Sequence, residues 1–337
     1  MEIKKNYNLK ELNTFGVNVH AKFFAEVGSE SELREVIISP EFTENKRFFL
    51  GGGSNILFIK DFDGIVIKNN FKGIEIVHED AESVTVRAGA GEVWHDMVHF
   101  TVERGLWGIE NLSLIPGTVG GAPVQNIGAY GAELKDTLEN VEAYDIETGM
   151  KKIFSLPECN FGYRDSVWKH EAKGKYFITA VTLKLNKHST PNTDYRVLKE
   201  YVEKNNLAIK TPKDVAGAVA EIRRSKLPDP KVLGNIGSFF KNAYVSTEKF
   251  AELLAQYPDM PHFQEKKIKI PAGWLIENAG WKGKRVGTVG VHEKQALVLV
   301  NYGGATAEEV WALAEGIIAS VFEKFGIQLE TEVNLIS

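Results

Sequence analysis

The chain has 337 residues, of which 43% are hydrophobic and 25% are charged. This composition is typical of a globular protein and excludes a disordered, collagen-like or membrane-bundle chain. The formal net charge is −5, and without a basic excess we expect no nucleic acid partner, because phosphate neutralisation dominates such binding. At roughly 150 residues per domain, the length predicts two or three domains.

The single cysteine, Cys159, excludes an intramolecular disulfide and a multi-cysteine zinc site. No histidine lies close to it in sequence, so we interpret Cys159 as a packed thiol rather than a nucleophile. The basic N-terminal residues are not followed by the apolar stretch of a signal peptide. No uncharged apolar run approaches the roughly 20 residues of a membrane span. We therefore expect a cytoplasmic protein with no membrane partner.

The first zone of the chain runs to about residue 70. A helix is predicted over 31–38, and short strands are predicted over 47–50 and 64–67. Between these strands lies Gly51-Gly52-Gly53-Ser54-Asn55, which predicts a glycine turn.

The second zone reaches about residue 186. Alternation predicts a strand over 83–88, and helical character follows from Glu92 to Arg104, ending at Gly105. The stretch 112–131 is rich in glycine and poor in charge, and 177–185 predicts a further strand.

A polar stretch, 186–195, predicts a loop that leads into the third zone. Helices are predicted over 213–226 and 308–325. The last segment, 327–336, alternates between apolar and mostly polar residues, which predicts a strand.

Several familiar nucleotide and nucleophile motifs are incomplete. Gly89-Ala90-Gly91 follows a strand and opens a helix, but Trp94 occupies the third glycine position of a dinucleotide fingerprint. No P-loop sequence occurs. Ser54 and Ser238 both miss the glycine pattern of a nucleophile elbow. The sequence therefore argues against a Rossmann site, a P-loop ATPase and a serine hydrolase.

His95 and His99 have the spacing of a zinc-protease helix. The intervening Asp96 is one methylene shorter than the glutamate of such enzymes, and the next histidine is His170. We interpret the pair as part of a partly exposed helix face and expect no metal site.

Glycine clusters carry the strongest signal. One is 51–55, and the other runs from Leu114 through Pro123 into 125–131. Glycines let backbone amides approach a phosphate closely, and such amide nests bind anions without lysine. Ordinary tight turns would explain one cluster alone. Two clusters that are low in charge and rich in Asn, Ser and Thr favour a large nucleotide-type cofactor.

Three polar positions are ambiguous on residue type alone. Arg164, between Tyr163 and Asp165, suits a guanidinium that clamps a carboxylate, although on residue type alone a surface ion pair is the better explanation. Ser238 follows a glycine turn and precedes two phenylalanines that could bury it as a proton donor. Glu332 shares its strand face with Glu330 and could be solvated.

Taken in order, these segments resemble one family over nearly the whole chain. They are Gly-Gly-Gly-Ser-Asn at 51–55, Ile-Pro-Gly-Thr-Val-Gly-Gly at 115–121, Gln-Asn-Ile-Gly-Ala-Tyr-Gly at 125–131, Tyr-Arg-Asp-Ser at 163–166 and Gly-Ser-Phe-Phe-Lys-Asn at 237–242. The family is the UDP-N-acetylenolpyruvoylglucosamine reductases, flavoenzymes of bacterial peptidoglycan synthesis. The long connection through Tyr195 resembles the subtype with a tyrosine loop over the substrate.

The resemblance implies an α+β protein with a vanillyl-alcohol-oxidase-like (PCMH-like) FAD-binding fold. It implies a first FAD-binding subdomain at 1–70, a second at 71–197 that carries the tyrosine loop, and a substrate-binding domain at 198–337. In that domain the C-terminal strand returns to the active site.

The resemblance also implies non-covalent FAD and NADPH as co-substrate. The reaction reduces UDP-N-acetylglucosamine enolpyruvate to UDP-N-acetylmuramate. Arg164 and Glu332 would stabilise the charge that develops beside the substrate carboxylate, and Ser238 would deliver the proton. We expect a monomer.

The remaining site residues follow from the same resemblance. The predicted FAD-binding residues are Gly51, Gly52, Gly53, Ser54, Asn55, Pro116, Gly117, Thr118, Gly120, Gly121, Asn126 and Gly128. The predicted substrate-binding residues are Tyr130, Tyr195, Lys226, Asn242 and Gln295. The chain departs from some relatives at Phe263, where they have tyrosine, and at Asn334, where they have arginine.

Two rival functions stay open on sequence alone. An FAD oxidase of the same fold could act on another small molecule, although the reductase segments at 163–166 and 237–242 argue against it. A nucleotide-sugar binding protein without catalysis would not need Arg164, Ser238 and Glu332.

Overall fold

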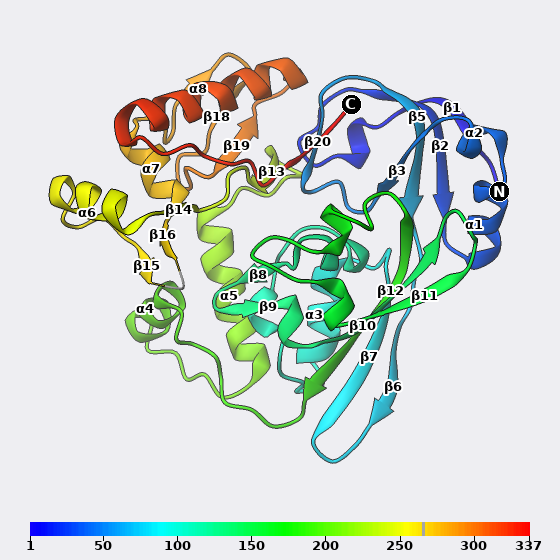
Figure 1. Ribbon diagram of the computed structural model, residues 1–337. Helices are drawn as coiled ribbons and strands as arrows, with labels where there is room; N and C mark the ends of the chain where they lie inside the picture. Colours follow the sequence, from blue (N-terminus) through cyan, green and yellow to red (C-terminus); the bar gives the residue numbers. More distant parts are fainter. Residues whose placement is uncertain (265–266) are drawn as a thin grey trace. The chain divides into compact units, whose positions relative to one another are not determined.

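A computed structural model describes residues 1–264 and 267–337 of the chain (Figure 1). The chain forms two compact units. The first contains residues 1–7, 21–52 and 63–225, and the second contains 8–20, 53–62 and 226–337. The three-domain division at residues 70 and 197 remains a prediction.

A four-stranded sheet opens the first unit. Its order is β1 (Lys4–Asn8), β2 (His20–Val27), β5 (Phe62–Asn69) and β3 (Lys46–Leu50), with β3 and β5 parallel. The helices α1 (Glu30–Ile37) and α2 (Pro40–Thr43) begin at serine N-caps, whose hydroxyls accept backbone amides of the first turn. Leu33, Val36 and Phe42 pack against Ile65 and Ile67 of the sheet.

A five-stranded antiparallel sheet forms the larger part of this unit. Its order is β11 (Lys151–Ser155), β10 (Leu138–Asp145), β12 (Tyr176–Asn186), β7 (Ser83–Gly89) and β6 (Ile74–Glu79). The helix α3 (Trp94–Val102) packs Trp94, Met97 and Val98 against the apolar side of this sheet. The sheet and α3 therefore hold the glycine-rich stretch that follows the helix.

The other elements of the first unit are short strands and two helices. The strands β8 (Gly128–Ala129) and β9 (Ala132–Glu133) form a small hairpin. The helices are α4 (Arg196–Lys204) and α5 (Pro212–Lys226), although Lys226 itself belongs to the second unit. Apolar residues of α5 pack with Leu198 and Trp107 in a separate small core.

The second unit is built from short sheets. One has the order β13 (Gly234–Ser238), β19 (Val298–Asn301), β18 (Val289–Val291) and β17 (Arg285–Val286). Another has the order β14 (Ala243–Val245), β16 (Ile268–Ile270) and β15 (Phe263–Gln264). The strand β4 (Ile56–Phe58) pairs in parallel with β20 (Asn334–Ile336), so the C-terminal strand joins a segment from the start of the chain.

Three helices complete the second unit: α6 (Thr247–Gln256), α7 (Ala272–Asn278) and α8 (Ala307–Phe325). A capping box starts α8, since the Thr306 hydroxyl accepts from the backbone of Glu309 and the Glu309 carboxylate accepts from the backbone of Thr306. Gly326, at a φ of +64°, ends it in the left-handed conformation.

The alternating C-terminal segment differs from its prediction. Ile327, Leu329 and Val333 are buried as the alternation requires, but only Asn334–Ile336 forms a strand. The residues before it make a single bridge, between Thr331 and Phe240, instead of a continuous ladder. The predicted strand over 327–336 is therefore wrong for most of its length, because alternation reports burial and not pairing.

The other predicted helices and strands are confirmed to within a few residues. Within the described ranges, no helix has the length and hydropathy needed to cross a membrane.

An ion network surrounds the buried Glu142 of the five-stranded sheet. Arg87 of β7 donates from Nε and Nη2 to the Glu142 carboxylate of β10, and Lys151 of β11 pairs with the same carboxylate. Hydrogen bonds from Arg87, aided by Lys151, lower the pKa of Glu142 to about 2. Glu142 therefore links β10 to the adjacent β11 and, across β12, to β7 while it is ionised.

We predict that Glu142→Gln lowers the melting temperature at pH 7 and that this deficit shrinks as the pH falls from about 5 toward 2. A pKa of about 2 against an ordinary 4.5 corresponds to about 3 kcal/mol at most. That stability is present above pH 4.5 and lost as Glu142 protonates. Thermal unfolding across pH tests this, with the exposed Glu139→Gln as control. A deficit that does not change with pH would contradict the role of the Glu142 charge.

Candidate functional site

The predicted glycine clusters meet inside the first unit. A Cβ on Gly52 would lie 2.7 Å from the Cα of Gly117, and a Cβ on Gly51 would lie 2.7 Å from Thr118 Oγ1. Such distances are shorter than side chains tolerate, so the backbones approach as only glycines allow. The turn at 51–52 and the loop at 115–121 therefore form one continuous backbone surface.

The loop at 115–121 is fixed by the chain that leads into α3. The Gly120 amide donates to the Ala90 carbonyl at 2.8 Å, and the Val119 amide donates to the Glu92 carbonyl at 2.8 Å. A Cβ on Gly120 would lie 2.6 Å from the Ala90 Cβ. The strand–helix turn that resembles a dinucleotide fingerprint thus supports the glycine loop.

The second half of the glycine turn belongs to the second unit. Gly53 has a φ of +66°, and a Cβ there would lie 2.0 Å from the Leu12 carbonyl oxygen. Asn55 accepts the Asn334 amide at 3.1 Å and donates from Nδ2 to the Glu332 carbonyl at 3.3 Å. Ser54 lies between Gly53 and Asn55 in the sequence. The turn therefore bonds directly to the C-terminal segment that carries Glu332.

Lys68 is a buried cation beside the glycine turn. It lies at the end of β5, and its Nζ donates to the Gly51 carbonyl. Burial lowers its pKa. Sequence reasoning missed this residue; the available signal was a lysine within the otherwise uncharged run Gly64–Asn70.

Arg164 is held by the β8 segment. Its Nη2 donates to the Gly128 carbonyl at 2.7 Å, and its own backbone has a φ of +55°. A Cβ on Gly128 would lie 3.2 Å from Arg164 Nη1. A glycine at 128 therefore lets the guanidinium lie directly against the backbone.

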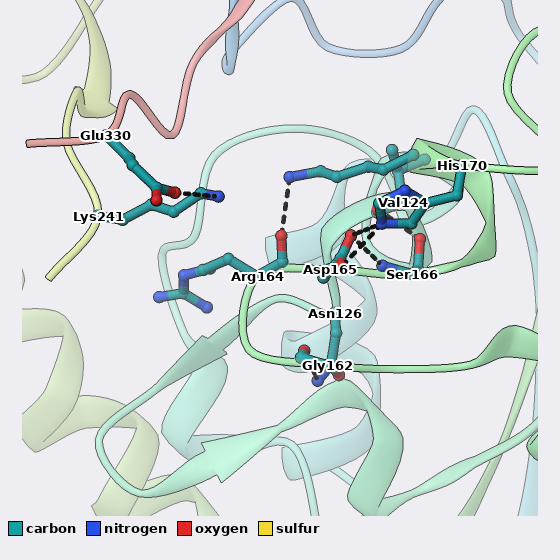
Figure 2. Close-up of polar contacts among 10 residues, drawn as sticks. Val124, Asn126, Gly162, Arg164, Asp165, Ser166, His170, Lys241 and Glu330 are labelled. Carbon is teal, nitrogen blue, oxygen red and sulfur yellow. Dashed lines mark hydrogen bonds and ion pairs between the residues drawn. The ribbon is translucent and has the colours of Figure 1, made fainter. Parts of the chain in front are cut away.

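Neighbours of Arg164 tie its loop to the glycine-rich stretch (Figure 2). The Asp165 carboxylate bonds His170 Nε2 at 2.8 Å, and the buried Ser166 hydroxyl donates to the Val124 carbonyl at 2.6 Å. The Arg164 carbonyl accepts from Lys169 Nζ at 2.8 Å. These bonds fix the backbone on both sides of the guanidinium.

The amide of Asn126 bonds three protein groups. Its Nδ2 donates to Glu133 Oε2 at 2.9 Å and to the Gly162 carbonyl at 3.2 Å, and its Oδ1 accepts the Lys135 amide at 3.1 Å. Asn126 is fully buried and has a φ of 43°. The side chain thus orders the loop that contains Arg164, and the cofactor contact predicted for it stays a prediction.

Ser238 and Glu332 lie on neighbouring extended segments of the second unit. Ser238 ends β13 directly after Gly237, which has a φ of +70°. The Glu332 amide donates to the carbonyl of Phe239, the residue after Ser238, at 2.8 Å. Phe239 and Phe240 are both buried, as the sequence predicts. Two members of the predicted catalytic trio are therefore brought together by backbone pairing.

Glu330 and Glu332 have different surroundings. The Glu330 side chain is 75% exposed and pairs with Lys241 Nζ at 3.3 Å (Figure 2). Glu332 is half-buried. The sequence left open that Glu332 is a solvated carboxylate. That description applies to Glu330 and not to Glu332.

The predicted tyrosines of the substrate site contact each other. The rings of Tyr130 and Tyr195 meet edge to face with centroids 5.6 Å apart. Burial raises the pKa of both hydroxyls. Asn111, which is buried, donates from Nδ2 to the Tyr130 carbonyl and to the Asn192 carbonyl. One amide therefore joins the Tyr130 turn to the tyrosine loop.

Arg223 of α5 is a second arginine that sequence reasoning missed. Its Nε is buried and has no hydrogen-bond partner among the described residues. Burial lowers the pKa of this guanidinium, opposed by Tyr130 and assisted by Arg164. The pair Arg223-Arg224 reads as an ordinary helix surface, and only the structure separates the buried arginine from the exposed one.

The other predicted substrate residues lie in the second unit. The Asn242 Oδ1 accepts the Ala272 amide at the start of α7, at 3.1 Å. A Cβ on Gly273, also in α7, would lie 3.2 Å from Gln295 Oε1. Asn242 and Gln295 thus both meet the first turn of α7, whereas Lys226 is an exposed residue at the end of α5.

The surroundings of Cys159 fit the sequence interpretation. Burial raises the pKa of the Cys159 thiol to about 12, so this cysteine is a packed, unreactive side chain. No cluster of three or more metal-ligating side chains occurs within residues 1–264 and 267–337.

Comparison with known proteins decides the family. Residues 229–336 match the C-terminal domain model of UDP-N-acetylenolpyruvoylglucosamine reductase, and residues 21–153 match an FAD binding domain model. The UDP-N-acetylenolpyruvoylglucosamine reductase of Flavobacterium johnsoniae is 50% identical, with all of both chains covered. That of Neisseria gonorrhoeae is 47% identical over 98% of this chain and 97% of the relative.

The chain belongs to the UDP-N-acetylenolpyruvoylglucosamine reductase family. It is therefore an FAD-dependent oxidoreductase. The solved reductase from Thermus caldophilus covers the whole chain at a TM-score of 0.68 and 26% identity, with 98% of that structure covered. The 6-hydroxy-D-nicotine oxidase of Arthrobacter nicotinovorans, at 14% identity and a TM-score of 0.53 over 97% of this chain and 86% of that chain, shares the fold alone. The predicted α+β, FAD-binding fold of the reductase family is confirmed.

The glycine loop of this reductase has the features that FAD requires. The hydroxyls of Ser113 and Thr118 are buried without a hydrogen-bond partner among the described residues. A buried hydroxyl of this kind usually has a partner, and a polar cofactor supplies one. Because Gly51, Gly52 and Gly117 leave backbone exposed beside Thr118, the surface suits a pyrophosphate-containing ligand.

We predict that Gly52→Ala lowers FAD affinity by at least tenfold. The new Cβ would lie 2.7 Å from the Gly117 Cα, so the turn and the loop must separate. Quenching of flavin fluorescence on titration of apoprotein measures the dissociation constant.

The matched control is Gly217→Ala in α5. A Cβ at Gly217 meets nothing within 4 Å, and alanine favours a helix over glycine. That variant should bind FAD as the parent does and be equally or more stable. Unchanged affinity in Gly52→Ala would show that the turn and the loop do not act as one site.

Proposed function

We propose that this chain reduces UDP-N-acetylglucosamine enolpyruvate to UDP-N-acetylmuramate with NADPH as the hydride donor, in the synthesis of peptidoglycan precursors. The observation that carries the proposal is the Glu332 amide bond to the Phe239 carbonyl, which holds Ser238 and Glu332 on neighbouring segments. Relatives of the same printed name at 44–50% identity over nearly the full chain support it.

FAD, when bound, supplies the hydride chemistry. Hydride addition to the vinyl carbon leaves negative charge on the neighbouring carbon and on its carboxylate. Arg164 would hold this charge, because a planar guanidinium matches a carboxylate with two donors. Its restraint by Gly128 supports this role, since a preorganised donor needs little rearrangement during the reaction.

Ser238 would donate the proton that quenches the developing charge. A hydroxyl is a weak acid, so its position matters more than its acidity. Gly237 and the buried Phe239 support a fixed position for the hydroxyl. Glu332 would face an anionic substrate, which requires that its carboxyl be protonated or bridged.

We assign Tyr130, Tyr195, Lys226, Asn242 and Gln295 to substrate binding. Lysine suits a diphosphate as a point charge. Because this chain has Phe263 and Asn334 where some relatives have tyrosine and arginine, we assign no residue to the uridine end of the substrate. The cytoplasmic location and the monomeric state stay predictions.

We predict that the purified protein is yellow and carries flavin without a covalent bond. Its visible absorbance spectrum should show bound flavin, and denaturation should release that flavin into the supernatant. The measurement is the spectrum before and after removal of denatured protein. A colourless preparation that remains inactive after FAD is added would contradict the assignment.

We predict that Ser238→Ala leaves reduction of the flavin by NADPH near the parent rate but slows its reoxidation by the enolpyruvyl substrate by about 10²–10⁴-fold, the usual contribution of a general acid. Stopped-flow absorbance follows the two half-reactions separately. Equal losses in both would remove the proton-donor role.

Ser246→Ala is the control for this substitution. Ser246 caps α6 in the same unit, so its loss should reduce stability by about 1 kcal/mol and leave both half-reactions unchanged. Rapid oxygen-driven turnover of an alcohol by the parent protein would favour the oxidase alternative. Sugar-nucleotide binding by protein that holds no flavin would favour the non-catalytic one.

A further inference from the structure

His95 makes a hydrogen bond that the reaction scheme does not use. It lies in the first turn of α3, and its Nδ1 accepts the backbone amide of Leu114 at 3.1 Å. Leu114 immediately precedes the glycine loop at 115–121 and has a φ of +55°. A leucine in this left-handed conformation is strained, so the surrounding contacts must hold it there.

The same helical turn holds the loop at two further points. Trp94 Nε1 donates to the Leu112 carbonyl at 3.0 Å, and the Trp94 amide donates to the Gly117 carbonyl at 3.1 Å. Leu114 lies between these anchors in the chain, so its bond to His95 fixes the middle of the span. This span also carries Ser113 and leads to Thr118, the residues with buried hydroxyls that lack protein partners.

The bond depends on the protonation state of the imidazole. Nδ1 accepts a hydrogen only in the neutral ring with the proton on Nε2, and in the protonated ring both nitrogens are donors. Protonation would therefore place two N–H groups against each other at the Leu114 amide.

The charged groups around His95 come from two helices. Asp96 and His99 are on α3, and Arg223 and Arg224 are on α5. Burial lowers the pKa of His95; Asp96 opposes this, while His99 and the arginines add to it. The neutral, accepting form is therefore the one present at neutral pH.

We propose that His95 is a positioning residue for FAD, holding the cofactor loop in its binding conformation by accepting the Leu114 amide. The neutral imidazole keeps the left-handed turn at Leu114 and so keeps Gly117 and Thr118 facing Gly51 and Gly52. Protonation of His95 releases this turn and weakens FAD binding as the pH falls below the ordinary histidine pKa of 6.5. The inference uses the FAD binding of the family and does not depend on the identity of the substrate.

The test compares His95→Asn with His95→Leu. The asparagine Oδ1 lies close to the place of Nδ1, accepts an amide hydrogen and does not titrate. The leucine keeps apolar bulk and cannot accept. We expect His95→Asn to bind FAD within about twofold of the parent at pH 8, and His95→Leu to bind about five- to tenfold more weakly, the usual effect of losing one hydrogen bond.

The pH profile separates positioning from simple packing. FAD dissociation constants for the parent and for His95→Asn are measured from pH 8 to pH 5.5, and their ratio removes the titration of FAD and of every other group. The ratio should be near one at pH 8 and rise severalfold at pH 5.5, because only the parent loses its acceptor. A flat ratio would overturn the proposal.

His99→Asn is the matched control on the same helix. Its side chain is 64% exposed and pairs with Glu103 at 3.6 Å, so its removal should leave FAD affinity at pH 8 as in the parent. Hydrogen exchange at the Leu114 amide should be faster in His95→Leu than in His95→Asn. If His95→Leu fails to fold, the ratio of the parent to His95→Asn still decides, and equal exchange in both folded variants would also overturn the proposal.

Discussion

The predicted cofactor surface depends on the contact between two stretches of main chain, at Gly52 and Gly117. Their separation leaves no room for a side chain on Gly52, so the turn and the loop meet directly through backbone. The positions of the loop residues that follow, including the buried hydroxyl of Thr118, depend on this close backbone contact. Because backbone groups cannot change rotamer, the surface is rigid before any ligand arrives.

The supports of this surface are distributed along the sequence. The strand–helix turn at Ala90 and Glu92 bonds the loop from one side, and Lys68 bonds the Gly51 carbonyl. Leu114, Tyr130 and Arg164 all have positive φ values, each of which costs on the order of 1–3 kcal/mol for a residue other than glycine. Side chains such as His95 and Asn111 bond the residues at these strained positions or their neighbours. These three strained positions lie in or beside the segments that are predicted to bind the cofactor and the substrate, and the packing of the five-stranded sheet and α3 supports those segments.

The sequence predicted the elements whose signals are local. The apolar spacing of α8 and the long buried run of β12 were sufficient, and the glycine clusters indicated a nucleotide-type cofactor before the fold was known. Pairing was not predictable in the same way. The strand β4 was missed because it is three residues long and pairs with β20, far away in the chain. The alternation of apolar and polar residues over 327–333 correctly indicated which side chains are buried, but these residues do not pair as a continuous strand.

The site residues differ in the same way, because some have a local sequence signal and others depend on contacts that are distant in sequence. Ser238 and Glu332 could be named from motifs, and their proximity in the second unit depends on a backbone bond that no spacing reveals. Lys68, Arg223 and His95 were missed or assigned to a solvated helix face, because each is ordinary in sequence and distinctive only through what surrounds it. The reactivity of a lysine, arginine or histidine depends on its burial and on its interaction partners, and the residue type alone reveals neither.

The reliance on main-chain groups at residues 51–52 and 117–118 bears on how an inhibitor could be evaded. A compound that engages those amides and carbonyls would make contacts that a change of side chain elsewhere cannot remove. Substitution of Gly51 or Gly52 would remove them, but it would also force apart the backbone that the cofactor uses. Resistance would have to arise from changes in expression, uptake or efflux, or from substitutions along the path by which the compound enters, and not from substitutions at the backbone groups that it contacts.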